Sequence, residues 1–162
     1  MNNQILYVRD GAGEFVQADP EAILEAARAH LRRRMRRGAT LSSPKLVRDF
    51  LTVTLGERGC EYFCVLLLDS RHRLVKFVEL FRGTIDGASV HPREVVKLAL
   101  IEGAASVVLV HNHPSQVGEP SHADELITQR LREALALIDV RVTDHLIVAG
   151  SEVVSFCERG LI

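Results

Sequence analysis

The stretch from Val107 to Asp124 constrains this chain most, because a core strand, two histidines and a helix start follow one another in it. Four consecutive apolar residues, Val107 to Val110, predict a buried strand. Side chains two apart on a strand point to the same face, so His111 and His113 should leave the strand end together. Pro114 then ends the strand. The sequence thus predicts two imidazoles side by side at the end of a core strand.

A helix start brings a carboxylate toward these histidines. Residues 118–120 turn the chain, and Ser121 is placed to be the N-cap of the helix that follows. Asp124 then lies in the first helical turn, where it can face the histidines. Two neutral imidazoles and one carboxylate suit zinc and leave a fourth position open for water, which is typical of catalytic sites. We therefore predict one Zn²⁺ per chain, held by His111, His113 and Asp124.

The same residues admit two other interpretations. Ser121 and Asp124 have the spacing of a capping box, which would explain both by helix initiation alone. Ser121 can cap the helix and still point its hydroxyl at the reacting water, so the two interpretations are compatible. The letters His111-Asn112-His113 also match the name of the HNH nucleases. In those enzymes the three residues are dispersed through a ββα unit, so we treat the match as coincidence.

Several motifs of the chain resemble those of one known family. They are His111-Asn-His-Pro-Ser115, Pro120-Ser121, Asp124 and Asp144-His145, with Glu79-Leu-Phe-Arg-Gly-Thr84 and Val90-His-Pro-Arg-Glu94 upstream. Together they are similar to the RadC branch of the JAB/MPN metalloprotease-like domains, whose wider JAMM signature is a Glu followed by His-x-His-x7-Ser-x2-Asp. The resemblance spans roughly residues 43–162.

The resemblance implies an MPN/JAB-like, cytidine-deaminase-like architecture in which the two histidines and the aspartate named above bind zinc. It further implies that Glu79 is the general acid/base and that Ser121 supplies the hydroxyl facing the oxyanion. Two positions depart from the family pattern. Gln116 stands where the branch usually has Gly, which bears on the loop conformation. Asn112 replaces the Ser or Thr found between the histidines of ubiquitin-cleaving relatives, which leaves the substrate open.

The environment of Glu79 also bears on its role. In the predicted strand 74–81, Glu79 shares a face with Val75, Phe77 and Phe81. A carboxylate among apolar residues should have a partner or a raised pKa, which suits a general base. The alternative is a strand-edge residue exposed by twist or a bulge. Two other candidates for the base, Glu94 and Glu102, lie in a predicted helix over 92–102 and are expected at its surface.

A second polar pair, Asp144 and His145, lies in a predicted strand over 140–149. These residues either orient a metal ligand from behind or form a buried polar pair. We favour the structural role for both.

A basic helix precedes the motif region. Asp19 and Pro20 predict a helix start and Gly38 its end. The C-terminal half of this helix is covered with arginines, among them Arg32, Arg33, Arg36 and Arg37. They either favour the negative end of the helix dipole or contact a nucleic-acid backbone or an acidic partner.

The order of the predicted elements indicates a mixed α/β (α+β) fold, with a curved sheet flanked by helices. Helices are predicted over 43–56, 92–102 and 121–137, and strands over 4–8, 62–68, 74–81, 107–110, 140–149 and 153–156. Residues 39–42 form a short linker, which divides the chain into an appendage over 1–40 and a domain over 41–162. The length of 162 residues, 47% of them hydrophobic, suits one such core.

Composition narrows the function classes. The three cysteines form no CxxC pair, which argues against a disulfide framework and a cysteine zinc site. No apolar run reaches the roughly 18 residues of a membrane span, and the N-terminus lacks a signal-peptide pattern, so we expect a cytoplasmic protein without membrane contact. The function that the resemblance implies is zinc-dependent hydrolysis of a peptide or isopeptide bond in a protein or peptide substrate. The alternatives are a DNA-associated protein that uses the fold for nucleic-acid binding or nuclease chemistry, and a noncatalytic scaffold.

Overall fold

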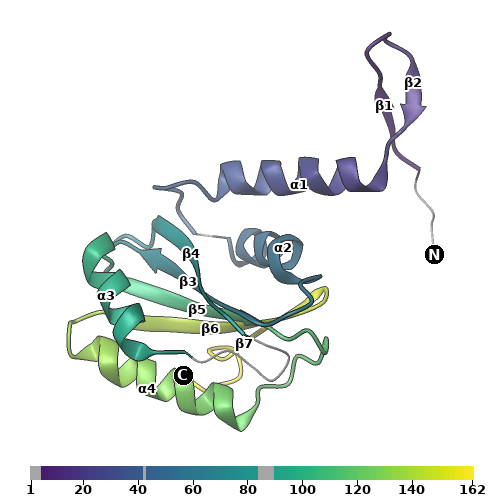
Figure 1. Cartoon of the computed structure of the whole chain (residues 1–162). Helices are drawn as coiled ribbons and strands as arrows, with labels where there is room; N and C mark the ends of the chain where they lie inside the picture. The colour runs from purple at the N-terminus through teal and green to yellow at the C-terminus, as the bar shows by residue number, and fades with distance from the viewer. Residues whose placement is uncertain (1–4, 42, 84–89) are drawn as a thin grey trace.

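The computed structural model describes residues 5–41, 43–83 and 90–162 (Figure 1). Gln4 of the predicted first strand, Ser42 of the predicted linker and Thr84 of the upstream motif lie outside the described residues. The helices are α1 (Pro20–Arg34), α2 (Pro44–Leu55), α3 (Pro92–Glu102) and α4 (His122–Ala136). The strands are β1 (Tyr7–Arg9), β2 (Phe15–Gln17), β3 (Tyr62–Leu68), β4 (Leu74–Arg82), β5 (Ser106–Asn112), β6 (Arg141–Ala149) and β7 (Glu152–Ser155).

One mixed sheet organises the domain. Its strand order is β4-β3-β5-β6-β7. The β5–β6 pair is parallel and the other neighbours are antiparallel. Figure 1 shows α1 and α2 on one side of the sheet and α3 and α4 on the other. The predicted mixed α/β fold is therefore confirmed.

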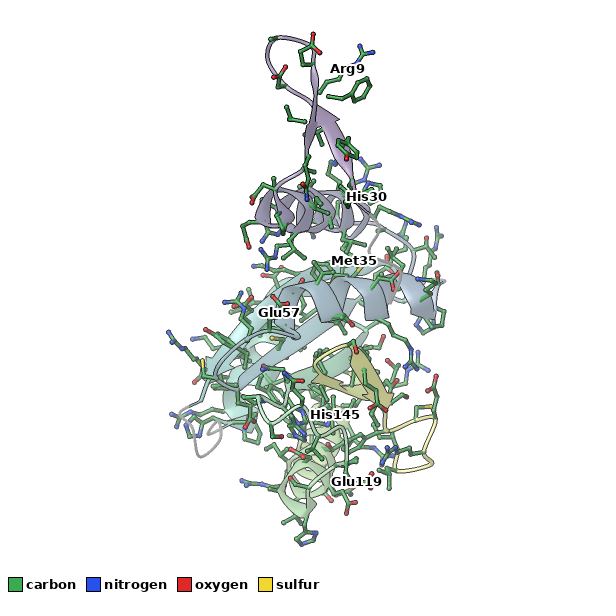
Figure 2. The ribbon with its side chains drawn as sticks, turned by 90° about the vertical axis from the view of Figure 1, so that its right-hand side faces the viewer. Arg9, His30, Met35, Glu57, Glu119 and His145 are labelled. Atoms are coloured by element: carbon green, nitrogen blue, oxygen red, sulfur yellow. The ribbon has the colours of Figure 1, made fainter. Side chains whose placement is uncertain are left out.

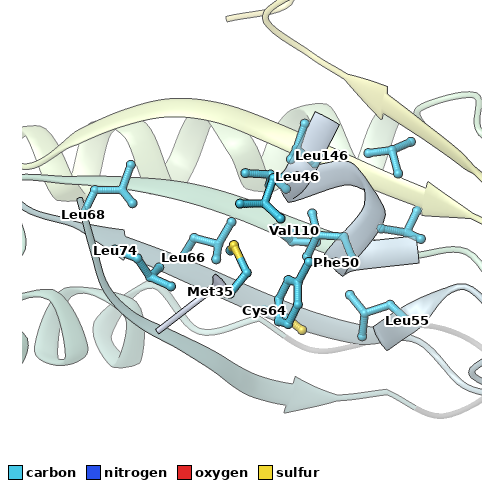
Figure 3. Close-up of a cluster of buried hydrophobic side chains, with 14 residues drawn as sticks. Met35, Leu46, Phe50, Leu55, Cys64, Leu66, Leu68, Leu74, Val110 and Leu146 are labelled. Carbon is cyan, nitrogen blue, oxygen red and sulfur yellow. The ribbon is translucent and has the colours of Figure 1, made fainter. Parts of the chain in front are cut away.

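Each face of the sheet has its own apolar core. On one face Leu66, which is completely buried, packs with side chains of α2 such as Phe50 and Leu51 (Figure 3). On the other face Leu109 packs with Leu131 of α4. Both cores are mainly aliphatic, as the aromatic content of 5% requires. The central strands are therefore apolar on both faces, which explains the continuous run from Phe63 to Leu68.

Replacing Leu66 with Ala should lower the free energy of unfolding by about 2–5 kcal/mol, because the cavity would lie between the sheet and α2. Leu137→Ala is the matched control, since Leu137 is 87% exposed and the same deletion leaves no cavity. Urea denaturation of the two variants measures the difference. Equal midpoints would contradict the placement of Leu66 in the core.

The helix starts agree with the capping pattern of the sequence. Asp19, Ser43 and Ser121 are N-caps, and each side chain accepts a hydrogen bond from a backbone N–H of the first turn. The end of α1 differs from the prediction. The helix stops at Arg34 rather than at Gly38, because Met35 leaves the helix and enters the core, where it is 7% exposed.

The N-terminal hairpin stands away from the sheet (Figure 1). Strands β1 and β2 pair in antiparallel register, and all of their residues are exposed. The first strand begins at Tyr7, three residues later than predicted.

Among the described residues, none of the helices combines the length and the apolar character needed to span a bilayer.

An irregularity in β4 changes which side chains share a face. Phe81 pairs with Phe63, but Glu79 pairs with Cys64, so Leu80 is an extra residue and the register shifts. Phe77 consequently packs in the core under α2, whereas Phe81 packs in the core under α3 and α4. The predicted common face of Phe77, Glu79 and Phe81 is therefore wrong, because simple alternation fails at the bulge.

Candidate metal centre

Three predicted ligands meet at the C-terminal end of β5. The Nε2 atoms of His111 and His113 lie 2.9 Å apart. The carboxylate of Asp124, in the first turn of α4, lies 3.2 Å from Nε2 of His111 and 3.5 Å from Nε2 of His113. One ligand atom from each residue thus lies within 4.8 Å of the others. The donor set of two imidazoles and one carboxylate fits zinc, with both histidines offering the same ring nitrogen.

A chain of hydrogen bonds behind His111 sets its tautomer. His145 is completely buried, and burial lowers its pKa well below the usual value, so its ring is neutral. The hydroxyl of Thr128 donates to the backbone carbonyl of Asp124, so it accepts from Nδ1–H of His145. Nε2 of His145 is then an acceptor, and it lies 2.8 Å from Nδ1 of His111. His111 therefore carries its proton on Nδ1 and leaves Nε2 free for a metal.

His113 is oriented by the loop that follows it. Its Nδ1 lies 2.6 Å from the carbonyl oxygen of Val117, so Nε2 faces Asp124. The hydrogen bond with Asp124 raises the pKa of His113 against the effect of partial burial, and the charges of Asp124 and Glu61 act in the same direction. Gln116 adopts a φ of 60° in this loop. The loop therefore makes a left-handed turn at this position without glycine.

The side chain of Asp124 both caps the start of α4 and faces the two histidines. Its Oδ2 accepts hydrogen bonds from the backbone N–H of Ser121 at 2.7 Å and from the Ser121 hydroxyl at 2.6 Å. Burial opposes its ionisation, but hydrogen bonds with His111 and His113 hold the pKa of Asp124 well below its usual range. The carboxylate is therefore ionised and ready to bind a cation. The predicted capping box is present, the same carboxylate is one of the three candidate ligand groups, and Ser121 lies beside them.

The structure does not bring Glu79 to this group. Glu79 lies opposite Cys64, whose side chain belongs to the core under α2, whereas His111 lies opposite Phe63 in the core on the other face. Its carboxylate is exposed and lies 3.4 Å from Nη2 of Arg58. The bulge thus turns Glu79 away from the three ligands. Both alternative candidates for the base form ion pairs of their own, Glu94 with Arg93 and Glu102 with Lys76, and the side chain of Glu102 is only 16% exposed rather than at the surface as expected.

Another carboxylate, that of Glu61, comes just before β3 and close in the sequence to the strand end that carries the site. Phe63 pairs with His111 across the antiparallel β3–β5 ladder, so continuing this register by two residues brings Glu61 toward His113. Side chains two apart on an extended chain share a face, which places Glu61 on the side of His111. Its negative charge acts on His113. The sequence places Glu61 just before the strand predicted over 62–68 but gives no sign of which strand lies beside it.

Asn112 fixes the backbone on both sides of Glu61. Its buried amide accepts a hydrogen bond from the backbone N–H of Tyr62 at 2.8 Å and donates one to the carbonyl oxygen of Cys60 at 3.1 Å. The residue between the two histidines thus ties the end of β5 to the start of β3. This role needs an amide with a donor and an acceptor, which Ser or Thr cannot supply in the same geometry.

The predicted pair Asp144 and His145 divides into two roles. His145 lies between the sheet and α4, as Figure 2 shows, and supports His111. Asp144 instead accepts hydrogen bonds from the Ser155 hydroxyl and from the backbone N–H of Cys157, so it orders the turn after β7. The structural role fits Asp144, whereas His145 orients a candidate ligand.

Replacing Thr128 with Val should weaken zinc binding by about 10- to 100-fold, because Nδ1–H of His145 loses its acceptor and the tautomer of His111 is no longer set. Thr143→Val is the matched control, since the Thr143 hydroxyl donates its hydrogen bond to the Val107 carbonyl rather than to a histidine. Competition with a chelating dye measures affinity, and ¹⁵N shifts report the His111 tautomer. Unchanged affinity in Thr128→Val would exclude this support.

Most of the chain matches a known protein family. Residues 41–161 match the family model of the RadC-like JAB domain. The chain is 55% identical over 152 residues to a UPF0758 protein of Thioalkalivibrio sulfidiphilus, covering 94% of this chain and 68% of that protein. It is 57% identical over 142 residues to a UPF0758 protein of Nitrosococcus oceani, covering 88% of this chain and 63% of that protein. The chain thus spans about two thirds of the length of these relatives, and it belongs to the family of RadC-like JAB domains.

Proposed function

We propose that the chain is a zinc-dependent hydrolase that cleaves a peptide or isopeptide bond. The observation that carries the proposal is the convergence of Nε2 of His111, Nε2 of His113 and the Asp124 carboxylate, with both Nδ1 atoms already engaged. Zinc held there would polarise the scissile carbonyl and lower the pKa of a water molecule. The same donor set would serve other hydrolyses, so the choice of bond follows the resemblance to JAMM metallopeptidases.

Glu61 is the proposed general acid/base. The register of β3 and β5, which brings Glu61 toward His113, and the effect of its charge on the pKa of His113 support this role, and Glu61 is not one of the three candidate ligands. From there Glu61 takes a proton from the attacking water and later delivers it to the leaving amine. The hydrogen bonds of Asn112 to Cys60 and Tyr62 hold the backbone of Glu61 in place during both transfers.

Ser121 is the proposed donor to the oxyanion. Its hydroxyl points at Oδ2 of Asp124, so it already lies at the edge of the site. A rotation about its Cβ–Oγ bond would redirect the O–H toward a developing negative charge, while Oγ still accepts the hydrogen bond from the backbone N–H of Asp124. The backbone N–H of Ser121 keeps its own hydrogen bond with Asp124, so the helix start would not have to change.

A complete set of ligands argues against a noncatalytic scaffold, because a scaffold needs neither free Nε2 atoms nor an ionised carboxylate. The experiment is to incubate the zinc-loaded chain with a peptide library from a bacterial proteome and to detect new N-termini by mass spectrometry. We expect new N-termini with the parent and none with Asp124→Asn. Identical products from both proteins, or none from either, would contradict the proposed function.

A further inference from the structure

Four arginines gather around an open hollow at the end of α1. The hollow has a volume of about 610 Å³ and is lined by Arg33, Arg34, Arg36 and Arg37, together with Gly38 and Ala39. All four arginine side chains belong to exposed residues. We refer to these six residues as the arginine hollow.

The charge of the arginine hollow is uncompensated. Arg28 and Arg32, earlier in α1, have acidic partners in Glu21 and Glu25. In residues 5–41, 43–83 and 90–162, no carboxylate lies within 4.0 Å of a guanidinium nitrogen of the four lining arginines. Residues 28–37 hold six of the 20 basic residues of the chain and no acidic one, although the formal net charge is −1. Positive charge is therefore concentrated at this end of the molecule.

The backbone that carries the arginine hollow is fixed to the domain. Met35, between the two pairs of arginines, is buried in the core where α1 meets α2 (Figure 2). The backbone N–H of Gly38 donates to the carbonyl of Leu74 at 2.7 Å, and that of Leu74 donates to Ala39 at 2.8 Å. The hollow is thus anchored to the start of β4 rather than to a fraying helix end. A fixed backbone lowers the entropy cost of binding a partner.

The helix dipole explains only part of this cluster. Cations in the last turn of a helix contribute about 0.3–1 kcal/mol each, and the effect falls off within that turn. The helix ends at Arg34, so Arg36 and Arg37 lie beyond it. Two arginines held outside the helix, next to two inside it, indicate an anionic ligand.

We propose that the arginine hollow binds the phosphate backbone of a nucleic acid. Guanidinium groups bind phosphates in a bidentate manner, and backbone contacts of this kind need cations alone. An acidic protein partner would need an apolar or aromatic anchor for stable binding. The lining of the hollow offers none, because its two non-arginine residues are Gly38 and Ala39. Binding should therefore be independent of base sequence.

The nucleic acid is a docking partner rather than the substrate in this proposal. The arginine hollow adjoins Leu74, which lies opposite Leu68 at the end of β3. His111 lies opposite Phe63, near the other end of the same strand. The seven residues of β3 span about 20 Å, so the two sites lie at opposite ends of the sheet. The proposal therefore does not depend on the hydrolase.

The test is fluorescence anisotropy of the full chain with labelled single-stranded DNA, duplex DNA and RNA of mixed sequence at rising salt. Four phosphate contacts predict a slope of about −3 to −4 for log affinity against log salt with duplex DNA. Replacing Arg33, Arg34, Arg36 and Arg37 with Gln should abolish binding, and replacing them with Lys should retain most of the slope. The matched control replaces Arg93, Arg130, Arg132 and Arg141 with Gln, which changes the charge equally on the exposed surface of α3, α4 and β6.

Binding that is lost in the Gln variant of the hollow and kept in the control supports the proposal. Equal losses of affinity in the Gln variant and in the control would show that binding follows the net charge of the chain rather than the hollow, which would contradict the proposal. Absence of binding to all three nucleic acids at low salt would overturn it as well. Polyglutamate that binds as tightly as DNA would assign the hollow to an acidic protein instead. Zinc content is measured in parallel and should be the same in every variant. A failure of the hydrolase proposal can then be told apart from a failure of the nucleic-acid proposal.

Discussion

Zinc should be lost from the chain when His113 is replaced by Ala. His113 supplies one of three converging ligand atoms, so its removal leaves only two residues to hold the metal. The loss of affinity should exceed the roughly 10- to 100-fold that an outer hydrogen-bond partner contributes. We expect about one zinc per parent chain and almost none in the variant after dialysis, measured by elemental analysis.

His122→Ala is the matched control for this measurement. His122 is the next histidine in the sequence and starts α4, but its side chain is 83% exposed and faces Glu125 rather than the ligands. Its removal should leave the zinc content unchanged. Equal zinc in the parent and in His113→Ala would show that the three residues do not form the site.

The three candidate ligands could be predicted because their signals are local. The histidines follow a run of core residues, and Asp124 follows an N-cap, so a strand end and a helix start place them within one short stretch. Helix starts at Asp19 and Ser43 were predictable for the same reason, since a capping residue and a proline act on adjacent backbone groups.

The partners of these ligands could not be predicted, because they depend on strand order and register. Glu61 comes beside His113 only through the antiparallel pairing of β3 with β5. His145 comes behind His111 only because β6 runs parallel to β5. The bulge at Leu80 turns Glu79 to the other face, and strict alternation along the sequence gives no sign of it. The pairing of strands that are distant in the sequence therefore determines which residues lie next to the candidate ligands.

The roles of Glu61 and Glu79 can be separated by two equivalent substitutions. Glu61→Gln and Glu79→Gln each preserve size and hydrogen bonding while removing one titrating carboxylate. We expect hydrolysis of a peptide cleaved by the parent to fall by about 10²- to 10⁴-fold in Glu61→Gln, because the water loses its proton acceptor. Zinc content should be unchanged in both variants, since neither residue belongs to the three converging ligands.

Glu79→Gln should retain nearly the parental rate. Its carboxylate lies against Arg58 on the face covered by α2, so its exchange alters a half-exposed ion pair worth about 1 kcal/mol or less. The prediction from the family motif gives the opposite order, with Glu79 as the base. A rate that falls in Glu79→Gln and holds in Glu61→Gln would restore that assignment, and it would require β4 to adopt a register without the bulge at Leu80. A rate that falls only in Glu61→Gln, with zinc retained, would identify the carboxylate opposite His113 as the proton carrier.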